Sequence, residues 1–400
     1  MTESYGEATR AVLTPSPAVP EQPPLGLPVY RTAAYRFQTA QDYSDVLGDR
    51  APGFSYSRID NPTSDAFAAA VAALEGYRVA GEVVGQPFAS GMAAISTTVM
   101  SQVSAGDHIV AQAALYGGTW SLLANVLSRF GVRTTFLADP TPEAVAAALT
   151  PQTKLVYLET LANPTLAVAD LPGVAAVAHA AGVPLAVDST FATPVVCRPL
   201  EHGADLVLHS ATKYLGGHSD VTGGVVVGRP DLLAPIRKLR IDLGGSLAPD
   251  EAFLLHRGVP TLPLRVRQHC ASALRIAEAL RQHPAVTRVH YPGLAEHPDH
   301  DLAVKLFDEG RYGGMVSVDL DGGRETGMAF CDGLRIGLNA TSLGGTHTKV
   351  SHVASTTHRQ LDDAALADAG IAASTVRISI GLEDTDDLIA DLRHALDMLP

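Results

Sequence analysis

The sequence predicts an α/β protein with a mainly parallel, seven-stranded sheet that has helices on both faces, followed by a smaller C-terminal α+β domain. Between about residues 80 and 258, short apolar runs alternate with helical patterns, which is typical of parallel strands joined by crossover helices. After Gly258 this alternation stops, and longer helical stretches lie between separate strands. We therefore expect an extended arm over residues 1–62, an α/β domain over 63–258 and an α+β domain over 259–400.

The arm is predicted from its composition. Six of the first 28 residues are proline and no apolar period is visible, so an extended backbone is expected there. Asn61-Pro62 favours a turn, and the helix that follows is expected to begin near Asp65, with Thr63 or Ser64 as its N-cap.

Seven apolar runs in the α/β region are the strand candidates. They are Val83–Phe88, His108–Gln112, Arg133–Leu137, Lys154–Glu159, Pro184–Asp188, Asp205–His209 and Gly224–Val227. The helical patterns between them cover Met92–Val103, Thr119–Phe130, Pro142–Leu149 and Leu171–Ala181. In the C-terminal region the candidate elements are Leu262–Gln282, Arg288–Tyr291, Leu302–Glu309, Met315–Leu320, Glu325–Cys331, Arg335–Leu338, Thr375–Ile380 and Asp384–Leu399. A ligand is expected beyond the carboxyl ends of the parallel strands.

Composition excludes several classes of function. The formal charge of −13 and the isoelectric point near 5.5 argue against nucleic acid or an anionic membrane as the main partner. Cys197, Cys270 and Cys331 form no close pair, which indicates a reducing compartment rather than a disulfide framework. No apolar run is long enough to span a membrane. We therefore expect a cytoplasmic protein that acts on a small molecule.

The stretch from Ser210 to His218, SATKYLGGH, lies between two apolar runs that are expected to be buried strands. A lysine in that setting must be paired, neutralised or covalently bound. Of the five lysines in the chain, Lys213 alone is predicted to have the setting of a desolvated amine that forms a Schiff base. The alternative is a structural lysine at a strand end.

Three further groups follow predicted strands. Ser90-Gly91-Met92 opens a helix, so its backbone N–H groups face any phosphate at that end, although many such turns bind nothing. Asp188 either caps a turn or keeps a ring nitrogen protonated. Tyr116 either packs on the sheet or stacks on a flat cofactor and acts as an acid.

Two more polar residues, Asn163 and Arg377, have both a structural and a functional interpretation. Asn163 precedes a proline and suits a turn. Arg377 lies in an alternating strand, where it requires an anionic partner. That partner is either a substrate carboxylate or one of the acids between Glu383 and Asp387.

The histidines form no recognisable metal site. Those near Pro298 and those between His347 and His358 match no zinc-ligand spacing, so no metal is expected. A phosphate seat, a stacking tyrosine, an acid for a ring nitrogen, a Schiff-base lysine and a carboxylate clamp together indicate a pyridoxal 5'-phosphate (PLP) enzyme that acts on an amino acid.

The chain resembles the Cys/Met-metabolism, or trans-sulfuration, family of fold-type I PLP enzymes. The resemblance extends from about residue 30 to the C-terminus and rests on five motifs. These are YSR with NPT at 56–63, SGM at 90–92, YGGT at 116–119, SATKYLGGH at 210–218 and VRISIGLED at 376–384. The family contains methionine γ-lyase, cystathionine γ-lyase, cystathionine β-lyase, cystathionine γ-synthase and O-acylhomoserine sulfhydrylases.

The resemblance implies a role for each matched position. Lys213 would hold PLP and move protons, and Tyr116 would stack on the ring and help to protonate a leaving thiol. Ser342 and Arg377 would hold the substrate carboxylate. The other cofactor contacts would be Asp188 to the pyridine nitrogen, Asn163 to the ring hydroxyl, Gly91, Met92, Ser210 and Thr212 to the phosphate, and Tyr56 and Arg58 to the phosphate of a neighbouring subunit. The resemblance therefore also implies a dimer, two of which form a tetramer.

The chain departs from the family pattern near the expected substrate. Gly118 replaces the cysteine of classical methionine γ-lyases, and Ser55 and Thr341 stand where members that handle cystathionine tend to carry acids. Thr346–Lys349 also lacks the usual acidic character. We therefore expect γ-elimination from a sulfur amino acid, with methionine favoured over cystathionine. The alternatives are γ-replacement on an O-acylhomoserine with a thiol, and a catalytically silent regulator with this fold.

Overall fold

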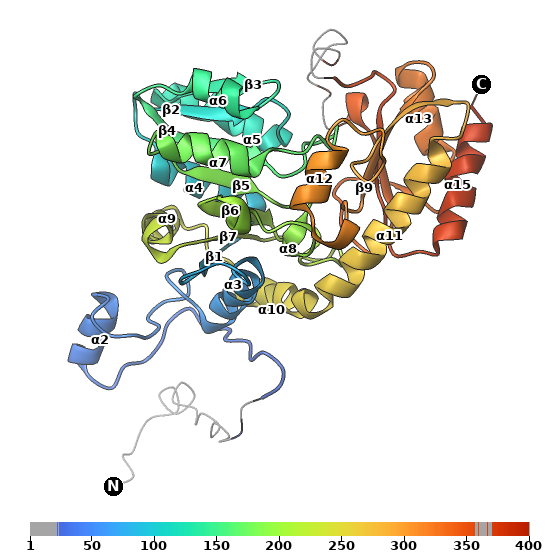
Figure 1. The fold of residues 1–400 in the computed structure, drawn as a ribbon. Coiled ribbons are helices and arrows are strands. Elements are labelled where there is room, and N and C mark those ends of the chain that lie inside the picture. Colours follow the sequence, from blue (N-terminus) through green and yellow to red (C-terminus); the bar gives the residue numbers. More distant parts are fainter. Residues whose placement is uncertain (1–21, 23, 357–358, 360–365, 367–369, 400) are drawn as a thin grey trace.

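The computed structural model describes residues 22, 24–356, 359, 366 and 370–399. Its larger part is built on a seven-stranded sheet that is mainly parallel, as predicted, with only β7 running against its neighbours (Figure 1). In spatial order the strands are β1 (Val84–Phe88), β7 (Gly224–Gly228), β6 (Leu206–Ser210), β5 (Leu185–Asp188), β4 (Thr153–Glu159), β2 (His108–Gln112) and β3 (Arg133–Leu137). Every one of the seven predicted strands is present.

Helices cover both faces of this sheet, so its strands are buried on two sides. Val207 and Leu208 of β6 point into opposite hydrophobic cores. One core is closed by α3 (Pro62–Glu75), α6 (Pro142–Ala148), α7 (Leu171–Ala180) and α10 (Pro249–Gly258). The other is closed by α4 (Gly91–Gln102), α9 (Pro230–Leu243) and the segment that begins with α5 (Gly117–Ser121). The short α8 (Thr193–Val196) contributes to the first core.

The C-terminal part has a five-stranded sheet of its own. The strands in spatial order are β10 (Leu338–Asn339), β11 (Lys349–His352), β12 (Val376–Ser379), β9 (Met315–Leu320) and β8 (Val286–His290). Its helices are α11 (Leu262–Leu280), α12 (His300–Leu306), α13 (Arg324–Asp332) and α15 (Thr385–Asp397), and α11 runs along both parts of the molecule (Figure 1). Apolar residues of α11, α13 and α15 pack on one face of the sheet. On the opposite face, Ser317 donates a hydrogen bond to the Pro164 carbonyl and Arg377 donates one to Asn163, both in the loop that follows β4.

The described residues that precede α3 include an arm that extends from the body and contains α2 (Ala40–Leu47), a helix with no buried residue (Figure 1). The first part of the predicted arm lies outside the described residues. The predicted N-cap of α3 was wrong, because Asn61 caps this helix through a bond from the Thr63 N–H to its side-chain oxygen at 2.9 Å. Pro62 does not prevent this start, since the first helical position needs no N–H donor.

Other predicted elements differ in their limits. The region predicted as one helix over 119–130 is α5 followed by a π-helical turn (η1, Leu122–Val126) and a 3₁₀ turn (η2, Leu127–Phe130). Gly131 ends it with a left-handed φ of 79°. Helix α9 was not predicted, because Pro235 lies inside it and interrupts the helical pattern. In the part of the chain that the structure describes, no helix is long and apolar enough to cross a membrane.

Candidate active site

Lys213 lies in the turn that follows β6, at the edge of the large sheet where several parallel strands end. Its Nζ donates a hydrogen bond to Ser342 Oγ of the C-terminal part at 2.8 Å. Burial, together with the positive charges of Arg377 and Lys349, lowers the pKa of Lys213 to about 8. A substantial share of the amine is therefore neutral near that pH and able to act as a nucleophile or a base.

Arg377 and Asn163 meet although 214 residues separate them in the chain. The Arg377 Nη1 donates to Asn163 Oδ1 at 3.1 Å, and both side chains are buried. None of the acids between Glu383 and Asp387 forms an ion pair with Arg377 among the described residues. Instead, Glu383 accepts bonds from Thr348, and burial lowers the pKa of Arg377 to about 10. The guanidinium therefore retains donors for an anionic ligand.

Asp188 ends β5 and lies beside Glu159, its partner on β4. Both carboxyl groups are buried. Burial raises the pKa of Asp188, and the hydrogen bonds from Thr190 oppose that rise, including one from its N–H at 2.9 Å. Burial and the charge of Asp188 raise the pKa of Glu159 well above its usual range. Asp188 thus caps the following turn and places a buried carboxyl group at this edge of the sheet.

Sequence reasoning missed Glu159. Its Oε1 accepts the backbone N–H of Tyr116 at 2.7 Å, so a buried carboxyl group fixes the backbone of the predicted catalytic tyrosine. The Tyr116 side chain itself is about half exposed. The signal in the sequence was an acid at the end of β4, which follows the same rule as Asp188 at the end of β5.

Gly118 lies against the Tyr116 ring. A Cβ at this position would be 2.6 Å from Tyr116 Cε1 and 2.9 Å from Met92 Sδ. Real Cβ atoms do not approach other atoms so closely. The absence of a side chain at position 118 therefore leaves the space that the Tyr116 ring occupies. The departure from the family pattern at position 118 is therefore coupled to the position of Tyr116.

Gly91 and Met92 open α4, whose N-cap is Ser90. A Cβ at Gly91 would be 2.7 Å from the Ser210 side chain, so the helix start and the end of β6 touch here. Thr212 lies in the next turn, where its Oγ1 accepts the Gly223 N–H at 3.0 Å. The structure therefore brings the four predicted phosphate contacts to one end of the sheet, next to a helix N-terminus.

Tyr56 and Arg58 lie elsewhere in the chain's own fold. Arg58 donates to the Ile241 carbonyl at 2.6 Å, and its guanidinium carbon is 5.8 Å from the centre of the Tyr56 ring. Tyr56 is 44% exposed. Among the described contacts, neither residue touches Lys213.

The burial of Lys349 was not predicted from the sequence. It is only 8% exposed, and its Nζ donates to Ser219 Oγ at 2.7 Å. The prediction that Lys213 alone is desolvated was therefore wrong. Lys349 follows a polar run, and only its pairing with β12 places it inside the molecule.

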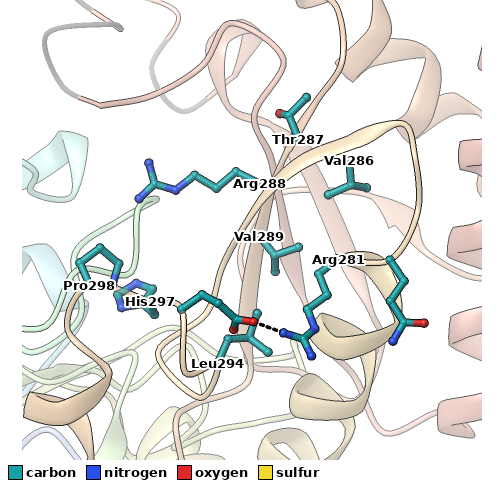
Figure 2. A pocket seen from close by; sticks show the side chains of 10 residues that line it. Arg281, Val286, Thr287, Arg288, Val289, Leu294, His297 and Pro298 are labelled. Atoms are coloured by element: carbon teal, nitrogen blue, oxygen red, sulfur yellow. Dashed lines mark hydrogen bonds and ion pairs between the residues drawn. The ribbon is translucent and has the colours of Figure 1, made fainter.

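A separate cavity of about 490 Å³ lies beside β8 in the C-terminal part (Figure 2). Arg281 at its edge forms an ion pair with Glu296. Burial lowers the pKa of His297 to about 4, so this side chain is neutral near pH 7. None of the predicted site residues lines this cavity.

Comparison with known proteins agrees with the resemblance. The family model for Cys/Met metabolism PLP-dependent enzymes matches residues 9–397. The chain belongs to this family. An L-methionine gamma-lyase from Porphyromonas gingivalis is 42% identical over 378 residues, which are 94% of this chain and 93% of the relative.

One further relative has a different described activity, and one solved structure contains the cofactor bound to lysine. An O-succinylhomoserine sulfhydrylase from Pseudomonas aeruginosa is 40% identical over 371 residues, 93% of this chain and 90% of the relative. A solved structure from Campylobacter jejuni carries a pyridoxyl-lysine monophosphate. It has a TM-score of 0.88 and 34% identity, and covers 93% of this chain and 95% of its own.

The cofactor of this Cys/Met-metabolism enzyme is PLP, and the residues around Lys213 fit it. The lowered pKa of Lys213 suits an amine that condenses with an aldehyde. At Gly91 the absence of a side chain leaves the α4 N-terminus open beside Ser210. Asp188 adds a buried carboxyl group at the next strand end. Each of these features suits one end of the cofactor.

Proposed function

We propose that the protein is a PLP-dependent C–S lyase that acts on a sulfur amino acid by γ-elimination, of the methionine γ-lyase or cystathionine γ-lyase type. The overall reaction converts R–S–CH₂CH₂–CH(NH₃⁺)–COO⁻ and water into R–SH, 2-oxobutanoate and ammonium. The observation that carries the proposal is the buried Lys213 amine beside Arg377. A base and a carboxylate clamp in that proximity suit an α-amino acid.

The residues of the chain divide the work as follows. Arg377 holds the substrate α-carboxylate, and Asn163 Oδ1 orients its guanidinium through the 3.1 Å bond. The Lys213 amine takes the proton from Cα, for which a pKa of about 8 provides neutral base. Ser342 Oγ holds this amine in place at 2.8 Å. When bound, PLP supplies an electron sink for the electron pair that remains at Cα.

Tyr116 donates the proton that the departing thiolate requires. Its backbone is fixed by Glu159, while its half-exposed ring is held only by close contacts such as that of Gly118. Asp188 keeps the ring nitrogen protonated from the buried end of β5. Gly91, Met92, Ser210 and Thr212 bind the phosphate at the start of α4. We retain these assignments as proposals.

The activity is tested by supplying methionine and cystathionine separately to the purified PLP-loaded protein and measuring 2-oxobutanoate. We expect oxo acid from at least one of them, and none from the Lys213→Ala variant. The absorbance near 420 nm that marks lysine-bound PLP should also disappear in that variant. If neither substrate yields oxo acid in the unaltered protein, the lyase proposal is wrong.

The second candidate is γ-replacement on an O-acylhomoserine with a thiol. It is supported by the O-succinylhomoserine sulfhydrylase relative at 40% identity. Product that forms only when both an acylhomoserine and a thiol are supplied would favour this activity. Oxo acid formed without a thiol would favour elimination.

We also infer that the active form is a dimer, which associates into a tetramer. The half-exposed Tyr56 and nearby Arg58 would reach the phosphate bound by the neighbouring subunit. Light scattering of the purified protein measures the assembly, and a monomer would contradict it.

The predicted arm, α/β domain and α+β domain, with limits at 62 and 258, are retained as a proposal. A cytoplasmic location is likewise proposed. It is supported by the three cysteines, which are all buried and free.

A further inference from the structure

Lys349 shares a face of the C-terminal sheet with Arg377. Along β11, Val350 points into the apolar core, so Lys349 and Ser351 point to the opposite face. Along β12, Ile378 points into the same core, and Arg377 therefore faces the larger sheet with Lys349. The register pairs Ser351 with Arg377, which makes Lys349 and Arg377 diagonal neighbours about 7–8 Å apart.

The ammonium of Lys349 is desolvated and has a polar but uncharged partner. Only 8% of the residue is exposed, and Nζ donates to Ser219 Oγ at 2.7 Å. Burial lowers the pKa of Lys349. No carboxylate of the described residues forms an ion pair with it. A nearly buried cation without a counter-charge is costly unless a ligand supplies one.

The ionisable groups whose charges interact near Lys349, which are Lys213 and Arg377, are also basic. Lys349 is close enough to Lys213 to lower the pKa of that amine, and Arg377 does the same. Glu383, which follows β12 in the chain, already accepts hydrogen bonds from the N–H and the hydroxyl of Thr348 at 2.6 and 2.8 Å. Three basic groups thus meet at this site. The substrate α-carboxylate accounts for Arg377, and the proposed roles in cofactor binding and proton transfer account for Lys213.

Lys349 is left without an anion in this assignment. We propose that Lys349 is a specificity-determining residue that binds an anionic group, a carboxylate, at the far end of the substrate γ-substituent. The inference rests on the proposed function, and it narrows the substrate to thioethers or esters of this charge. In an extended S-(2-carboxyethyl)-homocysteine, seven bonds separate the two carboxylate carbons by roughly 9 Å. Because about 7–8 Å separates the backbone positions of the diagonal neighbours and both side chains are long, their cationic groups are able to reach the two ends of a ligand of that length.

The test compares two thioethers that differ in the terminal group. S-(2-carboxyethyl)-L-homocysteine ends in a carboxylate and S-propyl-L-homocysteine in a methyl group. For the unaltered enzyme we expect kcat/KM to be about 10- to 100-fold higher for the carboxylate compound. Lys349→Met should abolish this preference, with a loss of kcat/KM at least about tenfold larger for the carboxylate compound than for the propyl compound. The smaller loss for the propyl compound reflects the higher pKa of Lys213 once the Lys349 charge is removed. Lys305→Met, at an exposed lysine of α12, is the matched control.

A pair of esters shows whether the terminal carboxylate is recognised on a thioether, on an ester or on both. O-succinyl-L-homoserine and O-acetyl-L-homoserine differ in the same terminal charge. A Lys349-dependent preference for both charged compounds supports recognition of the carboxylate itself. A preference confined to the thioether or the ester would still support the proposal and would define the leaving group.

Equal preference for the charged and uncharged compounds in the unaltered enzyme would overturn the proposal. So would an equal loss for both compounds in Lys349→Met, which would place Lys349 on the α-carboxylate or behind Lys213. If Lys349→Met does not fold, Lys349→Gln serves instead, since an amide retains a donor for Ser219 Oγ.

A binding measurement separates this inference from the proposed function. Calorimetry with L-2-aminosuberate and L-2-aminooctanoate uses probes that have no leaving group. We expect at least tenfold tighter binding of the dicarboxylate, lost in Lys349→Met and kept in Lys305→Met. If turnover fails but this difference persists, the lyase proposal falls and the role of Lys349 stands. Binding that is equal for both probes contradicts the role of Lys349 irrespective of turnover.

Discussion

Replacing Gly118 by alanine should separate activity from stability. The new Cβ would lie 2.6 Å from Tyr116 Cε1 and 2.9 Å from Met92 Sδ, whereas ordinary contact begins near 3.4 Å. The ring carbon must therefore retreat by about 0.8 Å. Both contacts are with side chains that are able to move, so the backbone need not shift.

The two effects have opposite signs. Alanine at a helical position is favoured over glycine by up to about 1 kcal/mol, so the free energy of unfolding should be unchanged or slightly higher. Displacement of the proton donor by about 1 Å costs up to about 100-fold in rate. We therefore expect kcat to fall by about 10- to 100-fold, with KM changed much less.

Steady-state kinetics with the substrate that the native enzyme accepts, together with urea unfolding, measures both quantities. Gly245→Ala is the matched control, because its Cβ would have its nearest contact at 3.5 Å, from Ala93. This variant should retain native kcat. A Gly118→Ala enzyme with native kcat and KM would refute the argument that the glycine positions Tyr116.

Three further results are expected. Burial lowers the pKa of His269 to about 4, so its contribution to stability is present above pH 6.5 and is lost as pH falls toward 4. His269→Gln, which retains a donor for the Gly381 carbonyl, should remove up to about 3 kcal/mol of that loss between pH 6.5 and 4 in unfolding titrations. Mixing refolded Lys213→Ala and Arg58→Ala subunits should restore about a quarter of native activity if Arg58 serves the neighbouring site, and no recovery would show that it does not. Arg377→Lys should raise KM for the amino acid by at least about tenfold in steady-state kinetics, because lysine lacks the planar pair of donors. Thermal unfolding that matches the native protein would show that the variant is folded.

Much of the fold could be predicted from local patterns. Most of the seven strands of the large sheet are short apolar runs, and such runs carry their signal within a few positions. Element limits were less certain where local signals conflict. Pro235 hid α9, and Asn61 rather than Thr63 or Ser64 caps α3. Asn61-Pro62 was interpreted as a turn, although proline is compatible with the first helical position.

The candidate site was predicted because its residues stand at strand ends. Asp188 ends a parallel strand, Lys213 and Tyr116 each follow one, and parallel strands end at the same edge. The role of Glu159 was missed, because its bond to the Tyr116 N–H joins residues 43 positions apart. Nothing local to either residue indicates that contact.

The sequence by itself determined the alternation of strands and helices, the family and the buried lysine motif, because each depends on residues close together in the chain. Only the tertiary structure decided what Arg377 and Lys349 face. Arg377 meets Asn163 across 214 residues, and Lys349 meets Ser219 across 130. These contacts depend on strand register, since a shift by one residue would turn both side chains into the apolar core. The motifs of the candidate site could therefore be recognised locally, whereas the neighbours of Arg377 and Lys349 depend on how the two sheets pack.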